Sequence, residues 1–121
     1  MIGLGNDILE IQRIREAMEE HGDRFVQRLF TQREQEYCSK YKDDIPHYAA
    51  RFSAKEAIVK ALGTGFGEEV SWLDIEIFNN PQGKPEVFLS DKLKRHFNNP
   101  EILIAISHSN HHVSTVALRV K

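Results

Sequence analysis

Two carboxylates, Asp7 and Glu56, stand far apart in the sequence at positions otherwise suited to a protein core. If the fold brings them together, they repel each other unless a cation lies between them. A hard divalent ion such as Mg²⁺, with water and ligand phosphates completing its shell, fits this ligand set. Arg51, Lys60 and His108 would then supply positive charge and hydrogen-bond donors around the phosphates. These residues indicate a site for a phosphorylated ligand.

Each of these residues also has a purely structural interpretation. Asp7 could cap a turn or a helix, and Glu56 could pair with Lys60 one helical turn away, which stabilises a surface helix by roughly 0.2–0.5 kcal/mol. The helix that carries Glu56 lacks an obvious polar face, however, and Arg51 and Lys55 fall within its apolar arc. Buried charges need partners, so this helix favours a site over a solvated surface.

Two further groups of residues have spacings that invite comparison with ligand-binding motifs. The run Gly63-Thr64-Gly65-Phe66-Gly67 allows a ligand to approach the backbone closely. It is not a Walker A loop, because the lysine precedes the glycines. The trio His108, His111 and His112 could suggest a metal site, but His111 and His112 are better explained as exposed turn residues. His108, beside Ser107 and Ser109, is a good donor to phosphate.

The elements that position these residues begin with a short strand over residues 1–11 and one or two helices over 10–30, broken at 21–23 with Asp23 as the second N-cap. A capping box, Thr31 to Glu34, begins a short helix that ends near Tyr41. The central helix opens at Ile45-Pro46 and ends at Gly63, where a C-terminal cap belongs. Its small residues, including Ala57 and Ala61, allow another element to pack closely.

The second half of the chain changes from helical to strand periodicity. Alternation predicts a strand over 73–78, a turn over 79–85 and a returning strand at 87–89. Ser90 caps a short helix through Asn98. Strands follow over 102–106 and 113–120, the last with Val116, Leu118 and Val120 on one side. Strands joined by tight turns predict an α+β fold, an antiparallel sheet packed with a long central helix.

Composition narrows the classes of function. The length suits one domain over residues 1–121. A formal net charge of −2 gives no support for nucleic-acid binding, and no apolar run is long enough to span a bilayer. The N-terminus lacks the pattern of a signal peptide. Cys38 is the single cysteine, which indicates an unpaired thiol in a reducing, cytoplasmic compartment.

The motifs, taken in order, resemble those of the holo-acyl-carrier-protein synthases, the short-chain class of 4′-phosphopantetheinyl transferases. The resemblance covers nearly the whole chain. The most specific stretch is Lys-Glu-Ala-x-x-Lys-Ala-x-Gly at 55–63. The other matching segments are 2–8 (Ile-Gly-Leu-Gly-Asn-Asp-Ile), 31–34 (Thr-Gln-Arg-Glu), 51–57 (Arg-Phe-Ser-Ala-Lys-Glu-Ala), 74–77 (Asp-Ile-Glu-Ile), 83–85 (Gly-Lys-Pro) and 107–109 (Ser-His-Ser).

The resemblance implies transfer of the 4′-phosphopantetheine arm of coenzyme A to a serine of apo acyl carrier protein, with adenosine 3′,5′-bisphosphate as co-product. Asp7 and Glu56 match the family's magnesium ligands, and Lys60 matches a lysine near the pyrophosphate that stabilises the leaving group. The base for the carrier serine is left open between Glu56 and a water held by the ion. The expected coenzyme A contacts are Arg51, Lys60, Gly65, Gly83, Pro85, His108 and Ser109.

The resemblance also implies partners. The active enzyme of this family is generally a homotrimer with each site at a subunit boundary, which offers an account of the very apolar strands at 102–106 and 113–120. Complementary charge governs encounter and partner choice, and one N-terminal surface matches the place where the family docks its acidic carrier protein. The residues of that surface are Arg13, Met18, Arg24, Phe25 and Arg28.

Two other functions compete with the transferase. A Mg²⁺-dependent hydrolase of a nucleotide pyrophosphate would need the same two carboxylates and no carrier surface. A non-catalytic subunit would bind a nucleotide or a carrier domain without turnover. The presence of Asp7, Glu56 and Lys60 together argues against the second of these alternatives.

Overall fold

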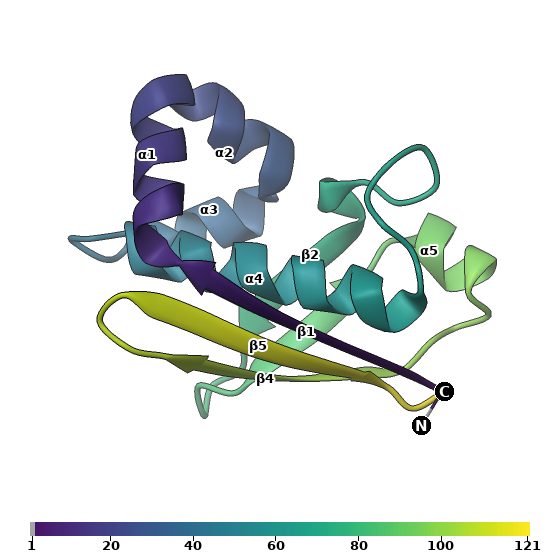
Figure 1. Cartoon of the computed structure of the whole chain (residues 1–121). Coiled ribbons are helices and arrows are strands. Elements are labelled where there is room, and N and C mark those ends of the chain that lie inside the picture. Colours follow the sequence, from purple (N-terminus) through teal and green to yellow (C-terminus); the bar gives the residue numbers. More distant parts are fainter. Residues whose placement is uncertain (1) are drawn as a thin grey trace.

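A computed structural model describes residues 2–121 as an α+β fold in which one long helix lies across a three-stranded antiparallel sheet (Figure 1). This confirms the fold class expected from the sequence. The sheet has the order β1-β5-β4, and a separate antiparallel pair, β2-β3, lies beside it. The strands are β1 (Gly3–Glu10), β2 (Ile75–Asn79), β3 (Pro85–Leu89), β4 (Ile102–His108) and β5 (His112–Arg119).

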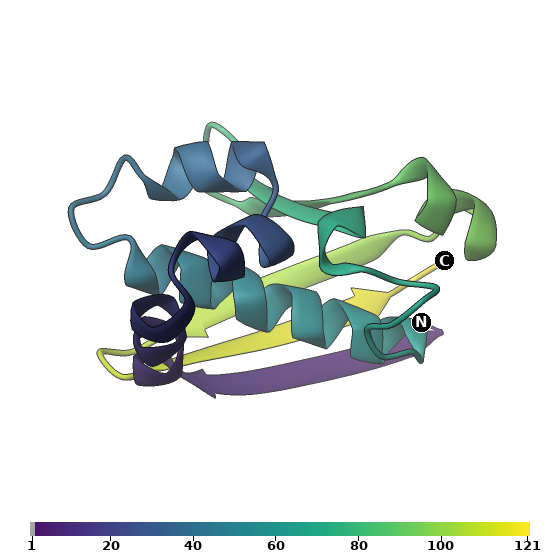
Figure 2. The ribbon, with the colours of Figure 1, turned by 90° about the horizontal axis from the view of Figure 1, so that it is seen from above.

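The helices gather on one side of this sheet, as the view from above also shows (Figure 2). They are α1 (Ile11–His21), α2 (Asp23–Leu29), α3 (Gln32–Cys38), α4 (Ile45–Leu62) and α5 (Asp91–His96), with a 3₁₀ turn η1 (Trp72–Asp74). Within residues 2–121, no helix is long and apolar enough to cross a membrane.

The central helix α4 begins and ends as its sequence predicts. Pro46 lies in the first turn, where the missing N–H costs nothing. Gly63 caps the C-terminus in the left-handed conformation, with φ 81°. Most of the residues between them are buried, because the sheet covers one side of α4 while α1, α3 and β2 contact it elsewhere. This explains why no polar face could be found in the sequence of the helix.

Two glycines let β1 lie unusually close to α4. A Cβ atom added to Gly5 would stand 2.0 Å from the carbonyl oxygen of Ala57, and one added to Gly3 would stand 2.0 Å from that of Ala61. One turn earlier on the helix, the Ser53 hydroxyl lies 2.9 Å from the Thr115 hydroxyl of β5. The small residues of α4 therefore form the seam against the sheet, as the sequence predicts.

The N-terminal helices differ from the prediction at their ends. The break at residue 22 is confirmed, but Asp23 is the first residue of α2 and not its N-cap, a position that Gly22 holds without a side-chain hydrogen bond. The capping box is confirmed, because Thr31 accepts from the Glu34 N–H and the Glu34 carboxylate accepts from the Thr31 N–H. The helix ends at Cys38, earlier than expected.

The C-terminal elements also shift by a few residues. Leu73 lies in the 3₁₀ turn and is 48% exposed, so it does not open β2 as its alternation suggested. Ser90 caps α5 as expected, and the helix ends at His96. Strand β4 runs on to His108, because the backbone pairing continues through His108 and Val113.

One face of the three-stranded sheet is uncovered and carries several exposed apolar side chains. Inward-facing residues of β5, such as Thr115 and Ala117, are fully buried against α4. On the opposite face, Ile8 is 72% exposed, and no helix of residues 2–121 covers this face (Figure 1). The other exposed apolar side chains of these strands are Leu4, Leu103 and Val116.

Candidate functional site

The structure brings Asp7, Glu56 and Lys60 together along the seam between β1 and α4. Asp7 points to the helix side of β1, where its side chain is 14% exposed. Lys60 donates to the Asn6 carbonyl oxygen at 2.9 Å, and its Nζ lies 3.4 Å from Asp7 Oδ1. The close approach that Gly5 permits is what lets a strand carboxylate meet side chains of the helix.

Glu56 carries charge that its surroundings do not fully compensate. Partial burial raises the pKa of this carboxyl, the neighbouring charge of Asp7 raises it further, and Lys60 lowers it. The local ion pair with Lys60 considered in the sequence is not formed within residues 2–121, because Lys60 turns toward Asp7. A divalent cation between Glu56 and Asp7 would offset the unfavourable charge at Glu56.

A second cluster surrounds Arg51, on another side of α4. Arg51 is 3% exposed, its Nη2 donates to Asn79 Oδ1 at 2.8 Å, and its guanidinium lies over the Tyr37 ring at 4.2 Å. Its Nε is buried and has no hydrogen-bond partner among the described residues. A buried donor without a partner costs free energy, and an anionic ligand would satisfy it.

Arg51 lines a pocket of about 320 Å³ that also holds His47, Gly83, Pro85 and His108. Gly83 takes a positive φ of 88° in the turn between β2 and β3. The pKa of His47 is lowered, mainly by burial and then by the charges of Arg51 and His108. Three nitrogen-bearing side chains and a backbone turn thus converge on one cavity, which suits a phosphate and a flat ring.

Some residues expected at the coenzyme A site lie elsewhere. Gly65 is exposed in the loop after α4. Ser109 occupies the turn between β4 and β5, where its hydroxyl accepts from the His111 and His112 N–H groups at 3.4 and 3.2 Å. Neither residue lines the pocket around Arg51, and Lys60 belongs to the carboxylate cluster. One chain therefore holds two separate halves of the expected set.

The expected carrier surface is also divided. Arg24, Phe25 and Arg28 line one hollow on α2. Arg13 borders a different hollow near the start of α1, and Met18 packs against the core beneath these helices.

The sequence did not indicate several residues of these sites. Tyr37 and Asn79 carry no motif and reach Arg51 only through the fold. His47 could have been found, since it lies one helical turn before Arg51. Glu34, read from sequence as a capping residue alone, also binds Lys55 at 2.7 Å. No three His, Cys, Asp or Glu side chains within residues 2–121 form a metal-binding group, so His108, His111 and His112 do not make one.

Comparison with known proteins gives consistent results. The family model of the 4′-phosphopantetheinyl transferase superfamily matches residues 3–117. A holo-acyl-carrier-protein synthase of Protochlamydia amoebophila is 50% identical over 117 residues, covering 97% of this chain and 96% of that protein.

Solved structures agree in fold. A crystal structure of holo-acyl-carrier-protein synthase from Neisseria meningitidis has a TM-score of 0.93 at 30% identity and covers all of both chains. The Helicobacter pylori holo-acyl-carrier-protein synthase in complex with coenzyme A has a TM-score of 0.85 at 32% identity, covering 96% of this chain and 98% of that one.

Proposed function

The chain belongs to the 4′-phosphopantetheinyl transferase superfamily, and we propose that it acts as a holo-acyl-carrier-protein synthase. It transfers the 4′-phosphopantetheine group of coenzyme A to a serine hydroxyl of apo acyl carrier protein and releases adenosine 3′,5′-bisphosphate. The observation that carries this proposal is the gathering of Asp7, Glu56 and Lys60 on one seam, where Lys60 Nζ lies 3.4 Å from Asp7 and the charge of Asp7 acts on Glu56. Relatives of that name match almost the full chain.

Asp7 and Glu56 fit a Mg²⁺ ion, because both are hard oxygen ligands on one seam, and burial together with the charge of Asp7 raises the pKa of Glu56. When bound, the ion would neutralise the charge that develops on the pyrophosphate as the bond breaks. Lys60 is half exposed and held at Asp7, so its ammonium stabilises the leaving phosphate. The acceptor of the serine proton is either Glu56 or a water held by the ion.

The pocket around Arg51 accepts the nucleotide end of coenzyme A. Arg51 and His108 bind phosphate, and the unpartnered Arg51 Nε offers a donor already in place. Gly83 and Pro85 border the space for the adenine. Gly65 and Ser109 belong to the same proposal as backbone and hydroxyl contacts contributed from loops.

The two halves become one site if neighbouring chains share them. The carboxylate cluster and the Arg51 pocket use different sides of α4, and the outer face of the sheet exposes Leu4, Ile8 and Val116. Exposed apolar side chains gathered on one uncovered face are typical of an interface. We therefore include a homotrimer with sites between subunits in the proposal. The measurement is the mass in solution, and an active strict monomer would contradict it.

The hollow formed by Arg24, Phe25 and Arg28 on α2 is the proposed docking point for the acidic carrier, with Arg13 and Met18 of α1 beside it. Charge reversal by Arg24→Glu should raise the KM for the carrier, by roughly 10-fold, and leave the KM for coenzyme A unchanged. Arg95→Glu, on the distant helix α5, is the matched control. Equal losses for both substrates would contradict the docking assignment.

A cytoplasmic location is part of the same proposal. Cys38 is free and buried, and burial raises the pKa of its thiol to about 12. The fold therefore has no disulfide that would require an oxidising compartment.

The reaction is tested by intact-mass spectrometry of apo acyl carrier protein incubated with this protein, coenzyme A and Mg²⁺, with and without a chelator. A mass gain of one phosphopantetheine that the chelator prevents is the expected result. No gain with a competent carrier would overturn the transferase. Analysis of the nucleotide products would then separate pyrophosphate hydrolysis from binding without turnover.

A further inference from the structure

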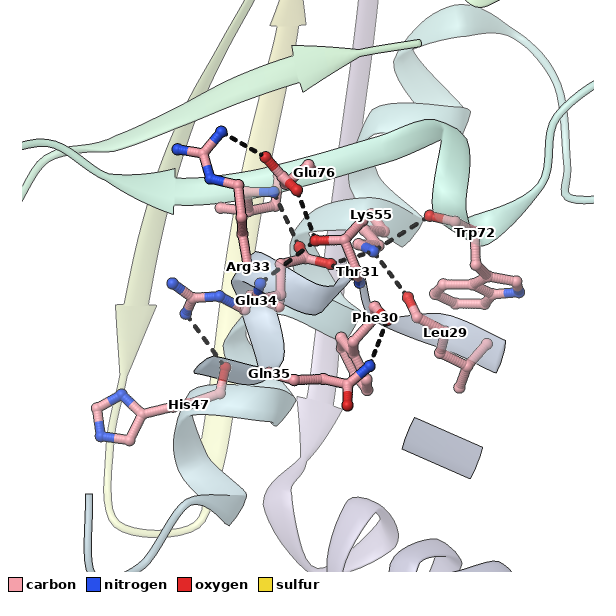
Figure 3. A network of polar contacts seen from close by, with 12 residues as sticks. Leu29, Phe30, Thr31, Arg33, Glu34, Gln35, His47, Lys55, Trp72 and Glu76 are labelled. Atoms are coloured by element: carbon pink, nitrogen blue, oxygen red, sulfur yellow. Dashed lines mark hydrogen bonds and ion pairs between the residues drawn. The ribbon is translucent and has the colours of Figure 1, made fainter. Parts of the chain in front are cut away.

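A buried ion pair lies in the interior beside the nucleotide pocket and takes no part in the reaction described above. Lys55 of α4 and Glu34 of α3 meet at 2.7 Å, and both side chains are 0% exposed (Figure 3). A buried charge is tolerated only when partners satisfy it. Whether Lys55 and Glu34 are fully satisfied depends on all of their hydrogen bonds.

Those contacts leave nothing free for a ligand. Lys55 Nζ donates to Glu34 and to the carbonyl oxygens of Leu29 at 2.7 Å and Trp72 at 3.1 Å, which uses all three ammonium hydrogens. Glu34 also accepts from the N–H groups of Thr31 and Ile77, each at 2.9 Å. The pair is a closed structural network and not a binding site.

The network joins three elements, α3, α4 and β2, through Glu34, Lys55 and the backbone of Ile77. The same three elements supply the Arg51 cluster, in which Arg51 of α4 contacts Tyr37 of α3 and Asn79 of β2.

The two sets are offset by one structural repeat on every element. Tyr37 follows Glu34 by about one helical turn, and Arg51 precedes Lys55 by one turn, so the members of each pair share a helix face. Asn79 lies two residues after Ile77, on the same face of the strand. The buried pair is thus a layer directly beneath the pocket layer.

We propose that Lys55 and Glu34 are positioning residues, which fix the relative setting of α3, α4 and β2 and thereby hold Arg51 in place to bind the nucleotide end of coenzyme A. The identity of that ligand rests on the proposed function. Groups that bind a ligand must be held within fractions of an ångström by a supporting shell. Directional hydrogen bonds between three elements supply such a constraint, which apolar contacts alone do not.

The competing explanation is that the pair only stabilises the core, and a double substitution separates the two. Replacing a buried ion pair by apolar residues of similar volume is often neutral for stability or increases it. The variant Glu34→Leu/Lys55→Met leaves no buried charge uncompensated, although the Ile77 N–H and the Leu29 and Trp72 carbonyl oxygens lose their partners. It should be less stable than the wild type but more stable than a variant that removes Lys55 alone.

The double variant should also bind its nucleotide ligands more weakly than the wild type. We expect the KM for coenzyme A and the Kd for adenosine 3′,5′-bisphosphate to rise roughly 10-fold. The kcat should change less than about 3-fold, because Asp7 lies on β1, which the network does not touch, and the Lys60 ammonium is anchored to Asn6 and Asp7 of that strand. A folded double variant with wild-type KM and Kd, or one that loses kcat alone, would overturn the proposal.

A milder variant decides the matter if the double variant does not fold. Glu76 of β2 accepts from the Thr31 hydroxyl at 2.6 Å at the edge of the network. Glu76→Ala removes this acceptor and should raise the Kd for adenosine 3′,5′-bisphosphate about 2- to 3-fold while the protein stays folded. An unchanged Kd in this variant would overturn the proposal.

The control and the wild type complete the design. Arg15→Gln breaks the exposed pair of Arg15 with Asp43, far from the network, and should leave both KM values unchanged. If the wild type binds neither coenzyme A nor adenosine 3′,5′-bisphosphate, the proposed function fails. If the wild type binds both and the network variants match it, the positioning role alone fails.

Discussion

Two consecutive residues of α4, Lys55 and Glu56, take part in polar groups of opposite character. Lys55 is enclosed and meets a carboxylate and two carbonyl oxygens. Glu56 is partly open, and its pKa is raised by partial burial and then by the neighbouring charge of Asp7. The comparison separates two uses of buried charge: a satisfied pair fixes the structure, whereas an unsatisfied pair is poised for a cation and its phosphates.

The largest effect is expected from substitution of Asp7 or Glu56. Asp7→Ala or Glu56→Ala should lower turnover by at least about 10³-fold, because the ligands of the proposed ion are lost. Neither substitution should reduce the Tm, since removal of one carboxylate relieves repulsion. Carrier modification is followed by intact mass and folding by circular dichroism. Full activity in either folded variant would sink the metal assignment.

Substitution in the buried Lys55–Glu34 pair should instead destabilise the protein. Lys55→Ala leaves Glu34 as a buried, uncompensated charge and should lower the free energy of unfolding by about 3 kcal/mol or more, measured by urea denaturation. Lys60→Ala, at a half-exposed pair, is the matched control and should cost less than about 1 kcal/mol. Similar losses in both variants would erase the distinction between the two groups.

The close packing of β1 against α4 also affects the site, because it brings Asp7 to the helix. Gly5→Ala places a methyl group against the Ala57 carbonyl oxygen and should destabilise the fold by about 1–3 kcal/mol. The strand should also move away from Glu56, which lowers activity beyond the loss of stability. Gly67→Ala, where no atom lies within 4 Å of the added Cβ, is the control. Equal stability of the two variants would show that the seam yields without cost.

The smallest expected effect is on the pH dependence of the Tm, through the charge of Glu56. The folded-state pKa of Glu56 is raised, so its contribution to stability is present below the unfolded pKa and is lost as the pH rises through the folded value. Without metal at pH 7, Glu56→Gln should therefore raise the Tm by about 2 °C, and the difference should vanish near pH 4. Thermal scans against pH measure it, with the exposed Glu16→Gln as control.

Added Mg²⁺ at pH 7 should reverse the order of the two Tm values, so that the wild type has a higher Tm than Glu56→Gln. The ion should stabilise the wild type more than Glu56→Gln, because it binds the ionised carboxylate. A lower Tm for metal-free Glu56→Gln would mean that Glu56 is stabilised in its charged form.

Local chemistry made much of this fold predictable. The capping box at Thr31, the proline at the start of α4 and the Gly63 cap depend on a few neighbouring residues, and all are confirmed. The ends of α3 and β2 were misplaced, because tertiary contacts decide where a marginal turn or alternating segment stops. Leu73 shows this, since its apolar side chain fits the strand pattern but lies in an exposed 3₁₀ turn.

The candidate site divides in the same way. The residue types at positions 7, 56 and 60 made a carboxylate cluster a hypothesis, the family resemblance supported it, and the structure brings the three side chains together. The partners of Arg51 and Lys55 could not be found, because Tyr37, Asn79 and Glu34 carry no local signal of a role in the interior. Only the packing of α3 and β2 against α4 brings them together.

The placement of the carboxylates and the Arg51 pocket on different sides of α4 has a consequence for mixtures of chains. In the proposed trimer, Asp7→Ala and Arg51→Ala would each inactivate every site of a pure assembly. Random co-assembly of the two inactive proteins would nevertheless pair an intact carboxylate half with an intact pocket at about a quarter of the sites, since each site takes its halves from two neighbours. The proposed trimer therefore predicts that two inactive variants recover activity when they assemble together.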